Sequence, residues 1–220
     1  EPEREYIFKH ALTCEAAYGL LLKSRRRDMH ARVGEALETL FADRRDEYAA
    51  MLAHHFTEAE DLPRALAYSR TAAANARRLY ALREEEGYRR RIIDLLERIS
   101  DTDPPVLIDA ITEWCWVRLR IADYDGVIDA IDRAIALARQ AGDRARLATA
   151  SSWGANYWLV TGFPSRAVPY LQQAEDIARE LGDDRALLLP FFFGTWSLVD
   201  HDPALAIKQL DEVIALSQKF

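Results

Sequence analysis

The chain has 220 residues, of which 50% are hydrophobic and 30% are charged, a composition typical of a folded globular protein and not of a disordered one. Its net charge of -7 argues against nucleic acid as a partner, and no run of about 18 apolar residues predicts a membrane-spanning helix. Two cysteines, Cys14 and Cys115, are too few for a disulfide framework, which favours a reducing, cytoplasmic location.

Residues 1–45 have a pattern of their own, which the rest of the chain does not repeat. The segment begins without a methionine or an apolar leader, so we expect a piece of a longer cytoplasmic polypeptide. The string Phe8-Lys9-His10-Ala11-Leu12 is followed by Ala17-Tyr18, by Arg25-Arg26-Arg27 and by His30. This order resembles the junction of signal-transduction ATPases of the STAND type, in which a helical or winged-helix-like module meets a C-terminal repeat array.

The resemblance is particularly to bacterial proteins that carry an adenylate or guanylate cyclase domain, then an ATPase domain, then repeats. Related transcriptional regulators end in a helix-turn-helix module instead. The resemblance implies that the parent chain is a nucleotide-dependent signalling switch, with a possible ATPase or cyclase elsewhere. It places neither site in this chain. ATP binding by the chain itself is not expected, because none of the nine glycines stands in a phosphate-binding loop that ends in Lys-Ser or Lys-Thr.

After residue 45, apolar residues recur at three- and four-residue spacing, which predicts helices. Leu52-Ala53-His54-His55-Phe56 fits the first repeat of such arrays, and Leu62-Pro63 predicts a helix start, where proline is tolerated. The stretch from Ala65 to Glu97 has two interpretations: two helices that meet near Ala81-Leu82, or one long irregular helix. The stretch Ser100-Asp101-Thr102-Asp103-Pro104-Pro105 predicts a break within the array.

A sequence pattern repeats beyond this break. Similar runs of Ala, Val, Ile and Leu begin at Val127, Ala167 and Ala206, which are 40 and 39 residues apart, and a fainter copy begins at Ala65. A small residue stands 12 residues before each start, which predicts that the two helices of each pair approach closely, because a larger side chain would separate them. These small residues are Ala53, Cys115, Ala155 and Gly194.

Gly142-Asp143 and Gly182-Asp183 each follow a long amphipathic run, as expected for a glycine that ends a helix. The small-residue column, the recurring runs and these turns resemble the tetratricopeptide repeat (TPR), a helix-turn-helix unit that stacks into a right-handed superhelix. The period of 39–40 exceeds the usual value of about 34, which longer second helices would explain. The resemblance implies an all-α fold of TPR-like helical hairpins over residues 46–220, with three clear repeats and a degenerate one.

The TPR resemblance also implies a concave groove lined by the first helices of the repeats, where a protein or peptide binds. An aromatic ring and an arginine beside amide and hydroxyl groups would suit an extended peptide or a helix. Other domains of the parent chain are further expected partners, as is a second copy of the chain through the apolar face of the last helix. Projection of the repeat places seven residues at the groove: Thr112, Trp116, Arg120, Ser152, Asn156, Phe191 and Thr195.

Other chemistry is weaker in the sequence. His54, His55 and Glu58 form the best metal-binding candidate, but adjacent histidines point about 100° apart on a helix and no third ligand stands at a known spacing. We therefore expect these histidines to be structural, with no metal and no cofactor. Cys115 falls in the packing column, and Arg89-Arg90-Arg91 is expected on a solvated surface.

These patterns predict a chain that is not itself an enzyme. We expect a protein-interaction and regulatory sensor region of a larger nucleotide-dependent signalling protein. Two alternatives stay open: a free-standing TPR adaptor, and an inducer-sensing repeat domain of a transcriptional regulator that binds a small molecule.

Overall fold

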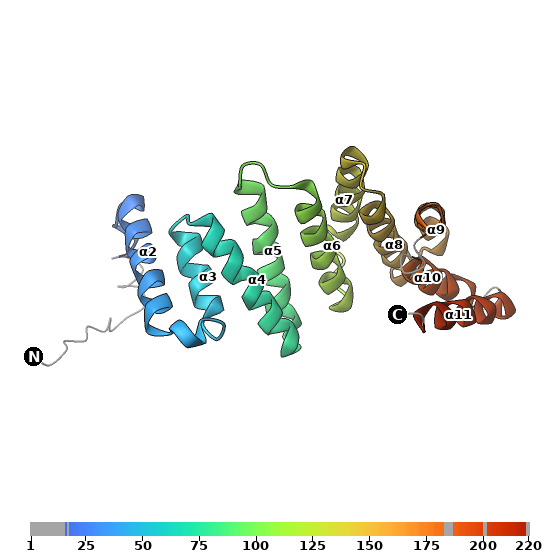
Figure 1. Cartoon of the computed structure of the whole chain (residues 1–220), viewed down its shortest axis with the longest axis horizontal. Coiled ribbons are helices and arrows are strands. Elements are labelled where there is room, and N and C mark those ends of the chain that lie inside the picture. The colour runs from blue at the N-terminus through green and yellow to red at the C-terminus, as the bar shows by residue number, and fades with distance from the viewer. Residues whose placement is uncertain (1–15, 17, 183–186, 200–201, 219–220) are drawn as a thin grey trace, which may run out of the picture. The chain divides into compact units, whose positions relative to one another are not determined.

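The computed structural model describes residues 16, 18–182, 187–199 and 202–218, which form helices joined by turns, with no strand among them (Figure 1). The all-α prediction is therefore confirmed. None of the helices in this part of the chain is long and apolar enough to cross a membrane. The chain divides into two compact units, Glu1–Leu79 and Tyr80–Phe220. The predicted boundary near residue 45, between the junction segment and the repeat array, stays a prediction.

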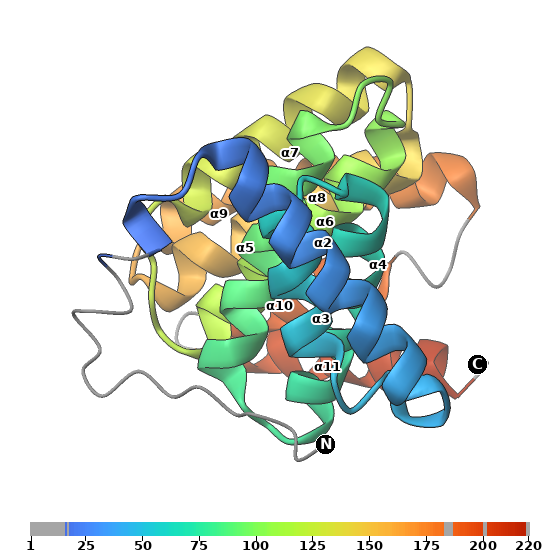
Figure 2. The ribbon, with the colours of Figure 1, turned by 90° about the vertical axis from the view of Figure 1, so that its left-hand side faces the viewer.

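The first unit places the predicted junction against the first repeat. Its helix α3 packs against both α2 and α4, and α2 lies in front of α3 in Figure 2. The core is made by Leu52, Ala53 and Phe56 of α3, all fully buried. Gly34 of α2 lets the two helices approach, because a Cβ there would lie 2.8 Å from the Phe56 ring. The elements are α2 (Lys23–Leu40), the 3-10 helix η1 (Ala42–Arg44), α3 (Ala49–Glu58) and α4 (Leu62–Arg78).

The second unit contains three successive helical hairpins. In each hairpin, α6 with α7, α8 with α9 and α10 with α11, two consecutive helices pack together, and α5 packs against α6 (Figure 1). The three recurring runs of the sequence fall in the second helices of these hairpins, as the repeat predicts. The elements are α5 (Leu82–Arg98), α6 (Pro104–Arg120), α7 (Val127–Ala141), α8 (Arg144–Val160), α9 (Pro164–Leu181), α10 (Leu188–Leu198) and α11 (Pro203–Ser217).

The predicted glycine turns are confirmed. Gly142 and Gly182 follow α7 and α9 with φ of 68° and 62°, in the left-handed region that glycine adopts without steric cost. Asp143 then caps α8, since its carboxylate accepts a hydrogen bond of 3.0 Å from the backbone N–H of Arg146. Asp183, the predicted partner of Gly182, lies outside the described residues.

The small-residue column is buried as predicted. Ala53, Cys115 and Ala155 are fully buried, and Gly194 is buried as well. Within the first hairpin of the second unit, the Cys115 thiol lies 3.9 Å from the carbonyl oxygen of Val127, to which it donates a weak hydrogen bond. Such contact between α6 and α7 leaves no room for a larger side chain at position 115.

Candidate functional site

The seven predicted groove residues lie on the first helices of the three hairpins. Helix α8 packs against both α6 and α10, so the positions follow one another across neighbouring helices. Four of the seven are buried, and three of these four are hydroxyl residues that donate a hydrogen bond to a carbonyl oxygen one helical turn earlier. Their hydroxyl groups therefore serve the helices that carry them. The four buried residues are Thr112, Ser152, Asn156 and Thr195.

The accessible part of the predicted groove is aromatic and cationic. Arg120 is exposed, and its guanidinium lies 4.6 Å from the centre of the half-buried Trp116 ring, both on α6. On α10, the half-buried Phe191 ring lies 5.8 Å from the guanidinium of Arg179. Arginine above an aromatic ring is a frequent element of protein interfaces. Binding at this groove stays a prediction, which now depends on Trp116, Arg120 and Phe191.

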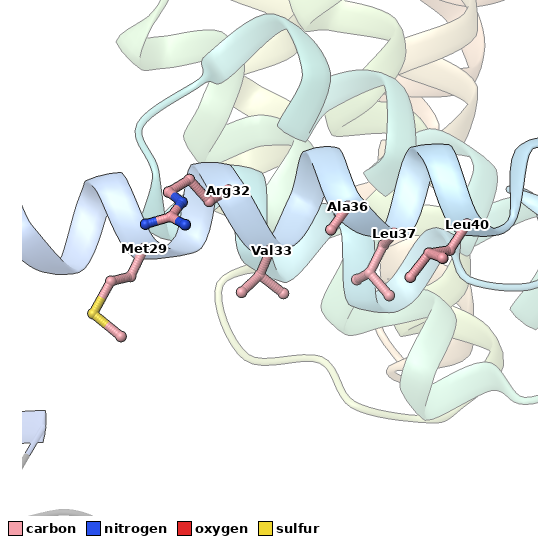
Figure 3. Close-up of a pocket in the computed structure, with 6 residues that line it drawn as sticks. All are labelled: Met29, Arg32, Val33, Ala36, Leu37 and Leu40. Carbon is pink, nitrogen blue, oxygen red and sulfur yellow. The ribbon is translucent and has the colours of Figure 1, made fainter. Parts of the chain in front are cut away.

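Helix α2 carries an apolar face that points away from the body of the first unit (Figure 3). The side chains of Met29, Val33 and Leu40 are 44%, 42% and 74% exposed. Ala36 and Leu37 continue the same stripe, and Arg32 stands beside it. Contiguous exposed apolar side chains are frequent in surfaces that bind other molecules. The spacing 29, 33, 36, 37, 40 is helical, so the sequence did carry this signal although it was not predicted.

Helix α11 exposes a second apolar stripe in the other unit. Leu205, Ile207, Leu210 and Ile214 are between 41% and 63% exposed, while Ala206 is buried against the hairpin. The sequence analysis expected an apolar face on this helix. Among the described residues, α2 and α11 thus each expose an apolar stripe.

Three histidines meet between α2 and α3. One ring nitrogen each from His30, His54 and His55 lies within 4.8 Å of the other two. No third ligand for the pair on α3 was predicted from the sequence, and the structure brings His30 of α2 to that place. No fixed spacing links His30 to His54, because a turn and η1 lie between their helices. Sequence patterns therefore could not have found the cluster.

Two further residues that the sequence singled out, Cys115 and Arg89, are buried. Burial raises the pKa of the Cys115 thiol to about 12, so the thiolate nucleophile is not formed near neutral pH. Cys14 lies outside the described residues. Arg89 is 7% exposed and its Nε donates to Glu85 at 2.8 Å, which corrects the expectation of a solvated arginine cluster at this position. The arginine is buried because α6 covers this face of α5, and it also pairs with Glu113 of α6.

Comparisons with known protein families and with curated proteins found no match to this chain. Comparison with solved structures did find similar folds. A STAND protein with a tetratricopeptide repeat sensor from Pyrococcus horikoshii matches 93% of this chain over 32% of its own length, with a TM-score of 0.65 and 14% identity. This chain therefore spans about a third of that protein.

Two further solved structures resemble the chain. A protein made of TPR-like repeats that are nearly identical to one another, from a putative kinesin light chain of Podosopora anserina, matches 90% of this chain over 96% of its own length. The TM-score is 0.62 and the identity is 12%. BtubC from P. vanneervenii matches 91% of this chain over 75% of its own length, with a TM-score of 0.56 and 15% identity. At such low identities the likeness concerns the fold. The chain is an all-α protein built of TPR-like helical-hairpin repeats.

Proposed function

We propose that this chain is the non-catalytic protein-interaction and sensor region of a larger nucleotide-dependent signalling protein of the STAND type. The observation that carries the proposal is the exposed apolar stripe of α2, the helix that precedes the first TPR-like hairpin. A helix that packs one face on the array and leaves another apolar face open is suited to connect the array to a neighbouring domain.

The N-terminal motif supports the same function. Arg25-Arg26-Arg27 and His30, which carry the resemblance to STAND junctions, lie on α2, and Leu52-Ala53-His54-His55-Phe56 lies on the helix that packs against it. In the Pyrococcus horikoshii protein, repeats of this fold are described as a sensor in a STAND protein. The proposed partner of the α2 stripe is accordingly the domain that precedes this chain in its parent.

The remaining surfaces fit the same proposal. The accessible groove residues Trp116, Arg120 and Phe191 would bind a protein or peptide, and the α11 stripe would be covered by further repeats or by a second copy. We propose a cytoplasmic, bacterial parent that carries an adenylate cyclase-like or DNA-binding output domain, because the junction motif resembles that class. A net charge of -7 disfavours nucleic acid as a ligand of this region.

The reading frame that encodes the chain provides the first test. We expect a phosphate-binding loop, Gly-x-x-x-x-Gly-Lys-Ser/Thr, a few hundred residues upstream in the same frame. A reading frame that starts immediately before Glu1 would contradict the proposal and would leave a free-standing TPR adaptor.

Leu40→Asp provides the second test, with Thr39→Asp as a matched control. Leu40 belongs to the apolar stripe and is 74% exposed, whereas the exposed Thr39 lies beside it outside the stripe. We expect Leu40→Asp to weaken binding of the upstream domain at least tenfold, because a buried apolar anchor is worth roughly 1.4 kcal/mol or more. Titration calorimetry measures both Kd values, and equal affinity of the two variants would exclude the stripe as the interface.

A further inference from the structure

Three of the five histidines of the chain converge in the first unit. His30 belongs to α2, whereas His54 and His55 are neighbours on α3. Their ring centres form a nearly equilateral triangle, 5.5 Å from His30 to His54, 5.1 Å from His30 to His55 and 5.3 Å from His54 to His55. The rings of His54 and His55 leave α3 in different directions, and His30 completes the set from the facing helix.

The contact between His30 and His55 is the closest in the cluster. Their two Nδ1 atoms are 2.9 Å apart, and two imidazole lone pairs at this distance repel each other unless a proton or a metal ion lies between them. The hydroxyl group of Tyr18 lies 2.9 Å from the other ring nitrogen of His30, Nε2. If the Nε2–H donates to the Tyr18 oxygen, Nδ1 keeps a lone pair that points towards His55. Histidines that bind metals are oriented in this way by an acceptor on the second nitrogen.

The surroundings of His30 and His55 favour the neutral imidazole. Burial lowers the pKa of His30, the charge of His54 lowers it further, and Glu58 opposes the shift. Burial also lowers the pKa of His55, together with His30 and His54. Neutral imidazole is the form that binds a metal ion, since the ligand nitrogen needs its lone pair. The exposed side chain of His54 leaves a path from solvent to the cluster.

We propose that His30, His54 and His55 bind one divalent transition-metal ion of the zinc class, with water in a fourth position. Imidazole nitrogen suits Zn²⁺, Cu²⁺ and Ni²⁺, and a tetrahedral ion with bonds of about 2.0–2.1 Å places its ligand nitrogens about 3.4 Å apart. That spacing lies between the 2.9 Å of the His30–His55 contact and the 4.8 Å limit of the cluster. Formation of the site would therefore require side-chain rotations that bring these distances to the tetrahedral spacing.

A metal ion at this place would join α2 to α3, and so the predicted junction to the first TPR-like hairpin. This role is separate from the proposed function, because the apolar stripe of α2 can bind a neighbouring domain with or without the ion. We expect the ion to stabilise the packing of α2 on α3. The three ligands converge only when the two helices are packed together, so metal binding favours that state.

Calorimetric titration of Zn²⁺ into the chelator-treated 220-residue chain tests the site. We expect one Zn²⁺ per chain, and at least tenfold weaker binding in His54→Gln, where an exposed side chain is replaced and the fold is kept. His30→Gln should lose binding as well, and far-UV circular dichroism checks that each variant is folded. Thr39→Gln is the control, since Thr39 is exposed on α2 and does not belong to the cluster, and it should bind Zn²⁺ as the unaltered chain does.

Tyr18→Phe tests Tyr18 as a positioning residue. It should weaken Zn²⁺ binding about 10- to 100-fold, while the visible absorption spectrum of bound Co²⁺ keeps its shape because the three nitrogen ligands remain. The His54→Gln spectrum should differ, because a ligand is lost. The proposal is overturned if the unaltered chain binds no Zn²⁺, or if His54→Gln and His30→Gln bind it as tightly as Thr39→Gln.

Discussion

At the scale of single residues, Gly154 allows two helices of the second unit to approach closely. It lies on α8, and a Cβ at this position would be 2.6 Å from Cε1 of Tyr170 on α9. The Tyr170 ring is not free to move away, because its hydroxyl donates a 2.8 Å hydrogen bond to Asp132. By contrast, a Cβ at Gly87 on α5 would have no neighbouring side chain within 4 Å.

We expect Gly154→Ala and Gly87→Ala to change stability in opposite directions. Alanine gains about 1 kcal/mol over glycine in a helix, which should stabilise Gly87→Ala by about that amount. In Gly154→Ala the same gain is opposed by overpacking that costs about 1–3 kcal/mol, so we expect a net loss of up to about 2 kcal/mol. Urea denaturation measures both, and stabilisation of both variants would show that Tyr170 yields without cost.

Packing residues that recur at the same position of each repeat could be predicted from the sequence. Residues whose packing depends on a contact found only once in the fold could not. Cys115 and Ala155 were predictable because the small-residue column recurs in each hairpin. Gly154 faces Tyr170 across a helix pair, and nothing in the repeat period indicates that contact. His30 likewise meets His54 and His55 only because α2 and α3 pack together.

At the scale of the elements, the helix break that the sequence left open is one that contains neither glycine nor proline. The turns at Gly142 and Gly182 were predicted, because glycine marks a left-handed residue. The break between α4 and α5 was left open, because its left-handed residue is Tyr80, with φ of 55°. Asp101 and Ala122 take the same conformation after α5 and α6, at a cost of about 1–2 kcal/mol for a residue other than glycine. The break after α5 was nonetheless predicted, because Asp101 lies in the stretch from Ser100 to Pro105, which separates α5 from α6 as expected. At Tyr80 the local sequence carries no such mark, and tertiary packing sets the turn.

A buried ion pair on α5 holds an arginine that also pairs with a glutamate of α6. Glu85 is fully buried and binds Arg89, which in turn pairs with Glu113 on α6. Removal of one charge leaves the other buried with fewer partners, which is more costly than the pair itself is worth. We therefore expect Glu85→Ala to destabilise the second unit by about 3 kcal/mol, near the lower end of the range for broken buried pairs, since Glu113 remains.

The adjacent Glu84→Ala is the control for this prediction. Glu84 is exposed, and a surface change of this kind alters stability by about 0.5 kcal/mol or less. Both variants lose the same negative charge from the first turn of α5, so the difference between them isolates burial and pairing. Thermal unfolding measures it, and equal melting temperatures would show that Arg89 finds a new partner in the absence of Glu85.

At the scale of the whole molecule, the fold was predictable and the candidate sites were less so. The repeat period and the glycine turns are local patterns that recur, and they specified TPR-like hairpins that the solved structures share. Four of the seven predicted groove residues are buried, because positions on the first helices serve packing between neighbours as well as the open face. A sequence period identifies equivalent positions, but it does not distinguish these two roles.

The division into two compact units gives a prediction for unfolding. All five tryptophans lie in the second unit, Tyr80–Phe220, so tryptophan fluorescence reports that unit, whereas far-UV circular dichroism reports the helices of both. If the units unfold in separate steps, the two urea curves should not coincide, as two-state unfolding would require. Superimposed curves would instead show one cooperative transition.

Variants of two closely packed glycines show which unfolding step belongs to which unit. Gly154→Ala, in the second unit, should move the fluorescence midpoint to lower urea. Gly34→Ala, whose Cβ would meet the Phe56 ring in the first unit, should leave the fluorescence midpoint unchanged and move only the step seen by circular dichroism. Gly34→Ala could also shift the fluorescence midpoint as much as Gly154→Ala does. That result would contradict separate unfolding, because a change in the first unit would then destabilise the second.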